Sequence, residues 1–378
     1  MTAQSEAELA EMVAGAEGPF CIRGGGTRGG RVPGTPLETG GLRGVELYEP
    51  GALTLVVRAG TPLAEVEAVL ARENQRLPFE PMDHRGLLGT GGEPTIGGVV
   101  AGNISGPRRI QVGAARDFLL GVRFVDGRGQ VIRNGGRVMK NVTGYDLVKL
   151  MAGSWGTLGV LTEVALKVLP RHETEATLRI TGLDDARAVA ALSAALGSPF
   201  EVSGAAHLPG GEVPVTLIRL EGFADQVAYR TGRLTETLAG FGEIAVEDDP
   251  DRSRALWQGV RDVAPFHGRP GDVWRLSVRP SQAPGLAARL GAEGLLYDWG
   301  GGLIWARVAE GTDLRARAGA FDGHATLVRA GEETRARLGV FQPEPAPLAA
   351  LSVGLRAKFD PRGLFNPGLM PAPQEAPA

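Results

Sequence analysis

The spacing of apolar residues in the first 170 positions predicts short strands and one clear helix. Residues 63–75 carry apolar side chains every three or four positions, with Thr61 placed to cap this helix and Pro62 to open it. Residues 163–168 alternate apolar side chains with charged or small ones, which predicts a half-buried strand that ends before Pro170. Similar patterns predict strands at 45–48, 53–58, 122–125 and 130–132 and a short amphipathic helix near 9–16.

The pattern changes near residues 170–174, where strands and helices begin to alternate. The expected elements are a strand at 175–180, a helix at 184–196, strands at 202–207 and 215–220, a helix at 224–241 and a strand at 244–247. This β-α-β-β-α-β order is ferredoxin-like. It recurs as a strand at 273–278, a helix at 284–290, strands at 295–297 and 303–308, a helix at 314–321 and a strand at 325–329.

These patterns predict an α+β chain with more than one domain. The expected domains are a first domain over 1–170, an antiparallel-sheet domain with helices on one face over 171–341, a C-terminal helix and turn over 342–370, and a disordered tail over 371–378.

Charge and cysteine content limit the kinds of function. The chain has 43 acidic and 40 basic residues, a formal net charge of −3 and no long basic block, which argues against nucleic acid or an anionic membrane as a partner. The single cysteine, Cys21, cannot form an intrachain disulfide or hold a four-cysteine iron–sulfur cluster. We expect Cys21 to be a buried small residue in a reducing, cytosolic compartment. The patterns of a signal peptide and of a transmembrane helix are both missing from the sequence.

Glycine is the most unusual component, with 57 residues that concentrate between Gly24 and Gly159. Residues 23–30 (RGGGTRGG) contain G-x-G-x-x-G, but the chain continues as RVPGTP, which cannot form the helix that a Rossmann site requires. No lysine followed by serine or threonine completes a P-loop. Two interpretations remain open: successive glycine amides that bind an anion without a helix, or a Gly-rich turn without a ligand.

Later segments share this small-residue character. Between residues 91 and 109, glycines surround Thr95, Asn103 and Ser105, whose side chains can hydrogen-bond a ligand, although a tight turn beside a packed helix would use the same glycines. Arg116 and Asp117 could form a surface ion pair of little energetic value. The remaining segments of this kind are 140–147 (KNVTGYDL) and 153–160 (GSWGTLGV).

Taken together, these ordered segments resemble the FAD-binding domain of the vanillyl-alcohol oxidase family, also called PCMH-type. The sequences at 105–109 (SGPRR), 116–117 (RD) and 141–146 (NVTGYD) resemble more closely the branch formed by the glycolate oxidase subunit GlcE. The residues at 358–368 (KFDPRGLFNPG) are similar to the closing helix and turn of the family, which return to the FAD-binding domain. The resemblance implies a PCMH-type, two-subdomain FAD-binding domain followed by a ferredoxin-like cap domain.

The resemblance also implies which residues bind FAD. The pyrophosphate would lie on the amides of residues 24–27, residues 95–105 would line the diphosphate and the isoalloxazine, and residues 78–81 (PFEP) would lie near the flavin ring. Gly159 and Val160 would reach the adenosine end. The full candidate set is Arg23, Gly24, Gly25, Gly26, Thr27, Arg28, Pro81, Thr95, Ile96, Gly97, Gly98, Gly102, Asn103, Ser105, Gly106, Arg116, Asp117, Gly159 and Val160. No histidine lies in the 24–30 loop, so noncovalent FAD is expected.

Catalytic residues are harder to assign. Relatives that oxidise hydroxy acids carry a His-x-Gly-Asp-Gly-Asn motif that this chain lacks, and its five histidines have no metal-ligand spacing, so we assign no metal and no general base. His267 with Arg275, or Asp298 and Trp299 near Trp305, could face the flavin, although packing and surface roles are the stronger interpretation for each.

The resemblance implies an FAD-dependent oxidoreductase that acts on CH–OH groups. The chain would be the FAD-binding subunit of a glycolate oxidase or dehydrogenase complex that converts glycolate, a small 2-hydroxy acid, to glyoxylate. Electrons would pass to GlcD-like flavoprotein and GlcF-like iron–sulfur subunits, and the location would be cytoplasmic, or peripheral at the inner membrane through those partners. Two alternatives are a non-catalytic scaffold of the same complex and a stand-alone FAD-dependent alcohol or sugar oxidase.

Overall fold

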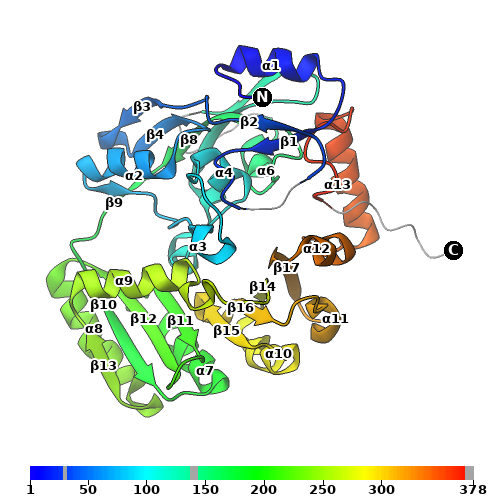
Figure 1. Cartoon of the computed structure of the whole chain (residues 1–378). Helices are drawn as coiled ribbons and strands as arrows, with labels where there is room; N and C mark the ends of the chain where they lie inside the picture. The colour runs from blue at the N-terminus through cyan, green and yellow to red at the C-terminus, as the bar shows by residue number, and fades with distance from the viewer. Residues whose placement is uncertain (29–31, 137–143, 371–378) are drawn as a thin grey trace. The chain divides into compact units, whose positions relative to one another are not determined.

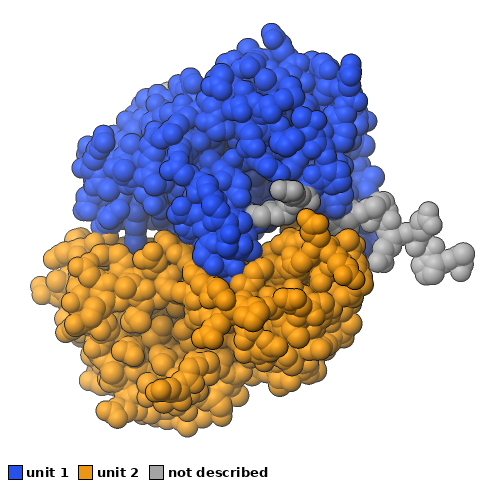
Figure 2. Space-filling view, viewed as in Figure 1, with its two compact units in different colours: residues 1–105, 114–171, 343–378 blue, residues 106–113, 172–342 orange. Residues whose placement is uncertain are grey.

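The computed structural model describes residues 1–28, 32–136 and 144–370 of the chain. Within these ranges, no helix has the length and apolar character needed to cross a membrane. The chain divides into two compact units (Figures 1 and 2). Unit 1 consists of Met1–Ser105, Ala114–Arg171 and Pro343–Ala378, and unit 2 of Gly106–Gly113 and His172–Gln342. Unit 2 therefore includes a short segment that precedes its main part by more than fifty residues in the sequence.

Unit 1 is built on an antiparallel sheet of five strands. Across the sheet these are β3 (Val45–Glu49), β4 (Thr54–Arg58), β8 (Val160–Lys167), β6 (Leu119–Val125) and β7 (Val131–Gly135). Two smaller sheets pair β1 (Phe20–Arg23) with β2 (Thr35–Glu38) in parallel and β5 (Gln75–Arg76) with β9 (Leu169–Pro170) antiparallel. The helices are α1 (Glu6–Ala14), α2 (Leu63–Arg72), α3 (Arg85–Leu88), α4 (Ile96–Ala101), α6 (Leu147–Met151) and α13 (Ala346–Phe359).

Helix α2 differs from its predicted form at both ends. It begins at Leu63 with Pro62 as its N-cap, because the Thr61 hydroxyl accepts a hydrogen bond from the Gly44 amide (2.9 Å) instead of capping the helix. It ends at Arg72, because Asn74 adopts a left-handed backbone (φ 51°) that leads into β5. The predicted stripe is nevertheless buried at Leu63, Val66 and Leu70.

The Asn366 side chain joins the C-terminal turn to the start of unit 1. Asn366 accepts a hydrogen bond from the Ile22 amide (2.8 Å) and donates one to the Trp155 carbonyl (2.8 Å). The Asp360 carboxylate holds the turn itself by accepting from the amides of Leu364 and Phe365 (2.9 and 2.8 Å). These bonds join segments from three parts of the sequence next to the first glycine-rich loop.

Unit 2 contains one antiparallel sheet of eight strands made of two ferredoxin-like halves (Figure 1). The first half contains β10 (Thr174–Thr181), α7 (Asp185–Leu196), β11 (Gly204–Leu208), β12 (Val215–Gly222), α8 (Ala224–Leu238) and β13 (Ile244–Glu247). The second contains β14 (Asp272–Val278), α10 (Ala283–Leu290), β15 (Gly294–Asp298), β16 (Leu303–Val308), α11 (Leu314–Ala318) and β17 (Gly323–Arg329), followed by α12 (Glu332–Leu338). The halves join where His207 of β11 pairs with Tyr297 of β15. The repeated β-α-β-β-α-β order confirms the predicted fold class.

Besides α12, two further helices of unit 2 were not predicted. One is α5 (Arg109–Val112), in the segment that unit 2 takes from the glycine-rich half. The other, α9 (Pro250–Arg261), starts where the Asp249 carboxylate accepts the amides of Asp251 and Arg252 (2.9 and 3.1 Å). Its Trp257 donates an indole hydrogen bond to Thr177 of β10 (2.8 Å), so α9 covers the sheet face opposite α7 and α8. The sequence signal for α9 was an acidic cap followed by proline.

Candidate functional site

Two glycine-rich segments of unit 1 meet in backbone-to-backbone contact. A Cβ atom added to Gly25 would lie 1.5 Å from the Glu93 carbonyl oxygen, and one added to Gly24 would lie 2.3 Å from Thr95 Oγ1. From the other side, a Cβ added to Gly92 would lie 2.1 Å from the Gly25 carbonyl oxygen. Neither segment therefore tolerates side chains at these positions. The two candidate motifs, at residues 23–30 and 91–109, pack directly against each other.

The amides of residues 24–27 form no hydrogen bond with the part of the chain that the structure describes. The turn is shaped by Gly26, which has a left-handed backbone (φ 69°) and no neighbouring atom within 4 Å of an added Cβ. Thr27 is buried, and its carbonyl accepts a hydrogen bond from the Thr90 hydroxyl (2.7 Å). Successive unpaired amides around a left-handed residue are the arrangement that binds anions in backbone nests.

The nearby helix α4 does not offer free amides. Its first four amides donate to protein oxygens: Ile96 to the Thr61 carbonyl (3.0 Å), Gly97 to the Ala59 carbonyl (2.8 Å), Gly98 to Thr95 Oγ1 (3.3 Å) and Val99 to the Thr95 carbonyl (3.0 Å). The helix end is thus already satisfied, and an anion here would be held by the loop and not by the helix.

Arg28 adds a positive charge beside these amides. Its Nε and Nη2 atoms are buried and have no hydrogen-bond partner among the described residues. Burial lowers the pKa of Arg28 to about 10, partly offset by the charge of Asp83. The guanidinium lies next to Gly98, where an added Cβ would come within 2.7 Å of Nη1. An unpaired guanidinium, free amides and backbone without Cβ atoms together fit the diphosphate of a dinucleotide such as FAD.

Three polar candidates hold loops together. Asn103, which has a left-handed backbone (φ 48°), accepts the Arg116 amide through Oδ1 (3.0 Å). The Ser105 hydroxyl accepts the Ala115 amide (2.9 Å), and the Asp117 carboxylate accepts the Ala114 amide (2.8 Å). The predicted surface pair of Arg116 and Asp117 is confirmed at 3.8 Å, with both side chains about half exposed.

Several candidate glycines are explained by packing. An added Cβ would lie 2.6 Å from the Ala59 carbonyl oxygen at Gly97, 2.9 Å from the Ile104 side chain at Gly102 and 2.7 Å from the Phe124 ring at Gly159. Val160 is buried at the start of β8, opposite Val125 of β6.

The remaining candidates lie in different surroundings. Arg23 ends β1, and its carbonyl accepts the Thr39 amide (2.8 Å). Ile96 and Pro81 are buried. Gly106 belongs to unit 2, where its carbonyl accepts the Trp299 indole (3.0 Å). The predicted segment at 140–143 lies outside the described residues.

In unit 2 the structure joins Arg275 to Trp299, with the guanidinium carbon 5.0 Å from the ring centroid. His267 is instead bonded through Nε2 to the Asp262 carbonyl (2.7 Å). Sequence reasoning missed Arg109, which also lies over the Trp299 ring at 4.6 Å, and His324, whose pKa is influenced by both arginines. The only available signal was the position of Arg109 in the SGPRR sequence.

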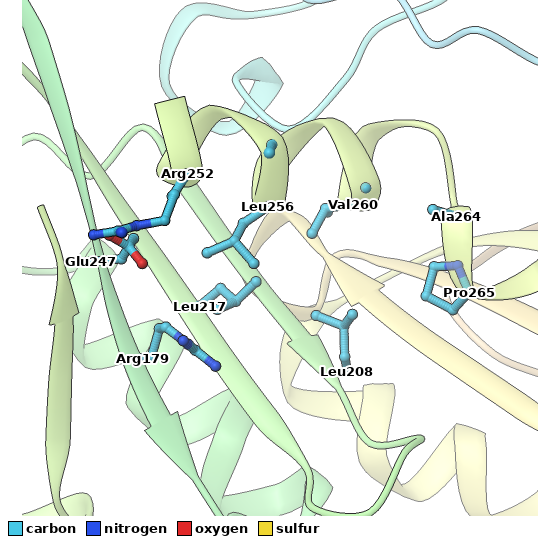
Figure 3. Close-up of a pocket in the computed structure, with 11 residues that line it drawn as sticks. Arg179, Leu208, Leu217, Glu247, Arg252, Leu256, Val260, Ala264 and Pro265 are labelled. Atoms are coloured by element: carbon cyan, nitrogen blue, oxygen red, sulfur yellow. The ribbon is translucent and has the colours of Figure 1, made fainter. Parts of the chain in front are cut away.

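A groove of about 510 Å³ lies between α9 and the first half of the sheet (Figure 3). Its lining is mainly apolar, and its Glu247 and Arg252 form an ion pair with each other (2.9 Å). It contains none of the candidate FAD-binding residues. Among the described residues, no three histidine, cysteine, aspartate or glutamate side chains are grouped as metal ligands.

Comparisons with known proteins show which proteins this chain is similar to. Residues 1–135 match the family described as FAD binding domain. The chain is 38% identical over 357 residues to glycolate oxidase subunit GlcE of Escherichia coli, covering 93% of this chain and 92% of that protein. It is 35% identical over 165 residues to glycolate oxidase subunit GlcD of Bacillus subtilis, covering 42% of this chain and 34% of that protein.

Among solved structures, alkyldihydroxyacetonephosphate synthase has the same fold, with a TM-score of 0.69 at 16% identity over 97% of this chain and 76% of that one. The fold, the FAD binding domain and the near full-length match together show that the chain belongs to the GlcE family of glycolate oxidase subunits.

Proposed function

We propose that the chain is the FAD-binding subunit of a glycolate oxidase or dehydrogenase complex and takes part in the oxidation of a small 2-hydroxy acid. The observation that carries this proposal is the loop at residues 24–28, where unpaired amides and the unpaired Arg28 guanidinium lie together against a second glycine segment. The match to two glycolate oxidase subunits supports the substrate class.

In this proposal the protein positions the cofactor and neutralises its charge. The amides of Gly24, Gly25, Gly26 and Thr27 would bind the diphosphate, and Arg28 would balance its negative charge. FAD, when bound, supplies the acceptor for the hydride removed from the hydroxy acid. The remaining candidates between residues 95 and 160 would shape the surrounding loops rather than each donate a hydrogen bond.

Noncovalent attachment is part of the proposal. The loop at 24–28 contains no histidine or cysteine, and Cys21 is buried in β1 with 3% of its surface exposed. Acid precipitation should therefore release all of the flavin into the supernatant. Flavin that stayed with the precipitated protein would contradict this part of the proposal.

Electrons must leave through other molecules. One cysteine cannot hold a four-cysteine iron–sulfur cluster, so we infer GlcD-like flavoprotein and GlcF-like iron–sulfur partners, with residues 1–170 and 342–370 as the FAD-binding part and 171–341 as the cap. We place the complex in the cytoplasm or at the inner membrane through its partners. Affinity purification from native extract tests this assembly by co-purification of a second flavoprotein and an iron–sulfur protein.

A second candidate function is a scaffold that binds FAD without oxidising substrate. The missing His-x-Gly-Asp-Gly-Asn motif favours it. Anaerobic mixing of the isolated, flavin-loaded chain with glycolate separates the two functions. Bleaching of the flavin absorbance would identify a catalytic subunit, whereas unchanged absorbance, with bleaching only after a GlcD-like partner is added, would identify a scaffold.

A further inference from the structure

Two arginines of unit 2 share one aromatic ring. The guanidinium carbons of Arg109 and Arg275 lie 4.6 and 5.0 Å from the centroid of the Trp299 ring. Arg109 belongs to α5, and Arg275 to β14. Two residues far apart in the sequence thus bring like charges onto one indole, which stabilises a cation but leaves their mutual repulsion in place.

Two hydrogen bonds hold Trp299 in place beside them. Its indole is buried and donates to the Gly106 carbonyl (3.0 Å), and its amide donates to the Asp298 carboxylate (2.7 Å). Trp299 has a left-handed backbone (φ 54°), and Gly300 and Gly301 continue in positive φ. A bulky residue in this conformation is strained, and such strain persists where the surroundings over-determine it, often at a ligand site.

The sheet register places His324 on the same face as Arg275. Trp274, Leu276, Ala325 and Leu327 belong to the core cluster that also contains residues of α10 and α11, so the alternating residues point to the other face. Arg275 pairs with Thr326, and Ser277 pairs with His324, so Arg275 and His324 are diagonal neighbours on that face. The His324 side chain is partly buried but still reaches solvent, so a ligand can reach the cluster from solvent in unit 2.

Arg275 lacks the partners that other arginines of unit 2 have. It makes no hydrogen bond or ion pair with the residues that the structure describes. By contrast, Arg108 binds Glu221, and Arg315 donates to the carbonyls of Leu338 and Val340. Burial and the charge of Arg109 lower the pKa of Arg275 to about 10, and the Asp298 carboxylate offsets only part of this effect.

The Arg275 guanidinium, which has no partner among the described residues, therefore leaves room for one anion. Of the two charges that act on it, Arg109 opposes its positive charge and the Asp298 carboxylate favours it. The pKa of His324 is lowered by burial and then by the charges of Arg275 and Arg109, which favours its neutral form. A half-buried guanidinium without a partner beside a neutral imidazole can bind a carboxylate through two parallel hydrogen bonds.

We propose that Arg275, assisted by Arg109 and His324 on the Trp299 platform, forms a binding site for the carboxylate of a small organic acid. The anion site rests on these contacts alone. Its assignment to the carboxylate of the 2-hydroxy acid rests on the proposed function.

Isothermal titration calorimetry of the full flavin-loaded chain tests the site directly. Glycolate is the probe, and ethylene glycol, which has the same hydroxyl but no carboxylate, is the neutral comparison. Glycolate should bind, ethylene glycol should not, and Arg275→Gln should weaken glycolate binding at least about tenfold. Arg279→Gln is the matched control, because Arg279 follows β14 but is exposed and paired with Asp322 (2.7 Å).

The remaining outcomes are also decisive. Unchanged glycolate binding in Arg275→Gln would overturn the site. Phosphate that bound Arg275 as tightly as glycolate would overturn the assignment of the site to a carboxylate.

Arg275→Gln should melt at the same temperature as the wild type or higher, because the substitution removes an unpaired charge. A large drop in melting temperature would mean that Arg275 has a structural role and would also count against the site. Flavin absorbance separates the anion site from the FAD function. An Arg275→Gln variant that is yellow but has lost glycolate binding supports the anion site. A colourless wild type that still binds glycolate through Arg275 would overturn only the FAD function.

Discussion

Arg108 Nη1 donates to both carboxylate oxygens of Glu221 at 2.9 Å, and both side chains are almost completely buried. This pair ties the segment at 106–113 to β12 within unit 2. Arg219 lies 3.6 Å from the same carboxylate, so Glu221 has two cationic neighbours. Arg109, next in the chain, is thereby presented to Trp299.

Replacing Arg108 should destabilise unit 2, because a buried carboxylate would lose its closer partner. Arg108→Met should lower the free energy of unfolding by about 3 kcal/mol. Arg233→Gln should change it by less than about 0.5 kcal/mol, because Arg233 pairs with Glu236 on the surface of α8. Urea denaturation followed by circular dichroism measures both values, and equal losses in the two variants would show that the buried pair has no special role.

Arg28→Gln should separate cofactor binding from stability. Without FAD, the variant should be as stable as the wild type or more stable, because a buried and unpaired charge is removed. With FAD, it should lose a charge-assisted contact of about 1.5–3 kcal/mol, or about ten- to hundredfold in Kd. Arg58→Gln is the control, since Arg58 is exposed and paired with Glu46. FAD titration monitored by flavin fluorescence would contradict the account if both variants bound alike.

Asn366 should stabilise unit 1 beside the glycine-rich loop at residues 24–28, through its two side-chain hydrogen bonds. Asn366→Gly keeps the left-handed backbone available (φ 44°) and removes only the bonds to Ile22 and Trp155. We expect a loss of about 1–3 kcal/mol in the free energy of unfolding. Asn74→Gly, at another left-handed position (φ 51°), should cost less. Thermal melts of both variants test this expectation, which fails if Asn366→Gly melts with the wild type.

The pKa of His324 should depend on the charges of Arg275 and Arg109. Burial and the charges of Arg275 and Arg109 lower its pKa, so Arg275→Gln should raise it toward the usual value near 6.5. Because the folded pKa lies below the unfolded one, the contribution of His324 to stability is present above about pH 6.5 and is lost as pH falls through the folded pKa. Nuclear magnetic resonance titration of the imidazole in both proteins measures the shift, and an unchanged pKa in the variant would place His324 away from Arg275.

The sequence predicted the fold better than the site. The two ferredoxin-like repeats were found because helical and strand periods alternate clearly after residue 170. Helix α9 was missed, although Asp249 and Pro250 mark its start. Thr61 was misread as a cap because its hydroxyl accepts the amide of Gly44, which lies 17 residues earlier in the sequence.

The glycine content of a segment does not show whether its glycines allow close packing or leave amides free for a ligand. Gly25 and Gly97 belong to equally glycine-rich segments, but Gly97 packs against Ala59, whereas Gly25 meets the Glu93 backbone beside free amides. Likewise, Arg28 and Arg275 are informative because partners are missing around them in the described structure, which a sequence does not reveal.

FAD titration of the deflavinated chain is the most direct test of the central claim that the glycine loop binds the cofactor. Gly25→Val would drive a side chain into the Glu93 backbone, whereas Gly40→Val is the control because an added Cβ at Gly40 meets no atom within 4 Å. The account predicts that the wild type and Gly40→Val bind FAD with equal affinity and turn yellow, while folded Gly25→Val stays colourless. A folded Gly25→Val protein that bound FAD as tightly as the wild type would contradict it.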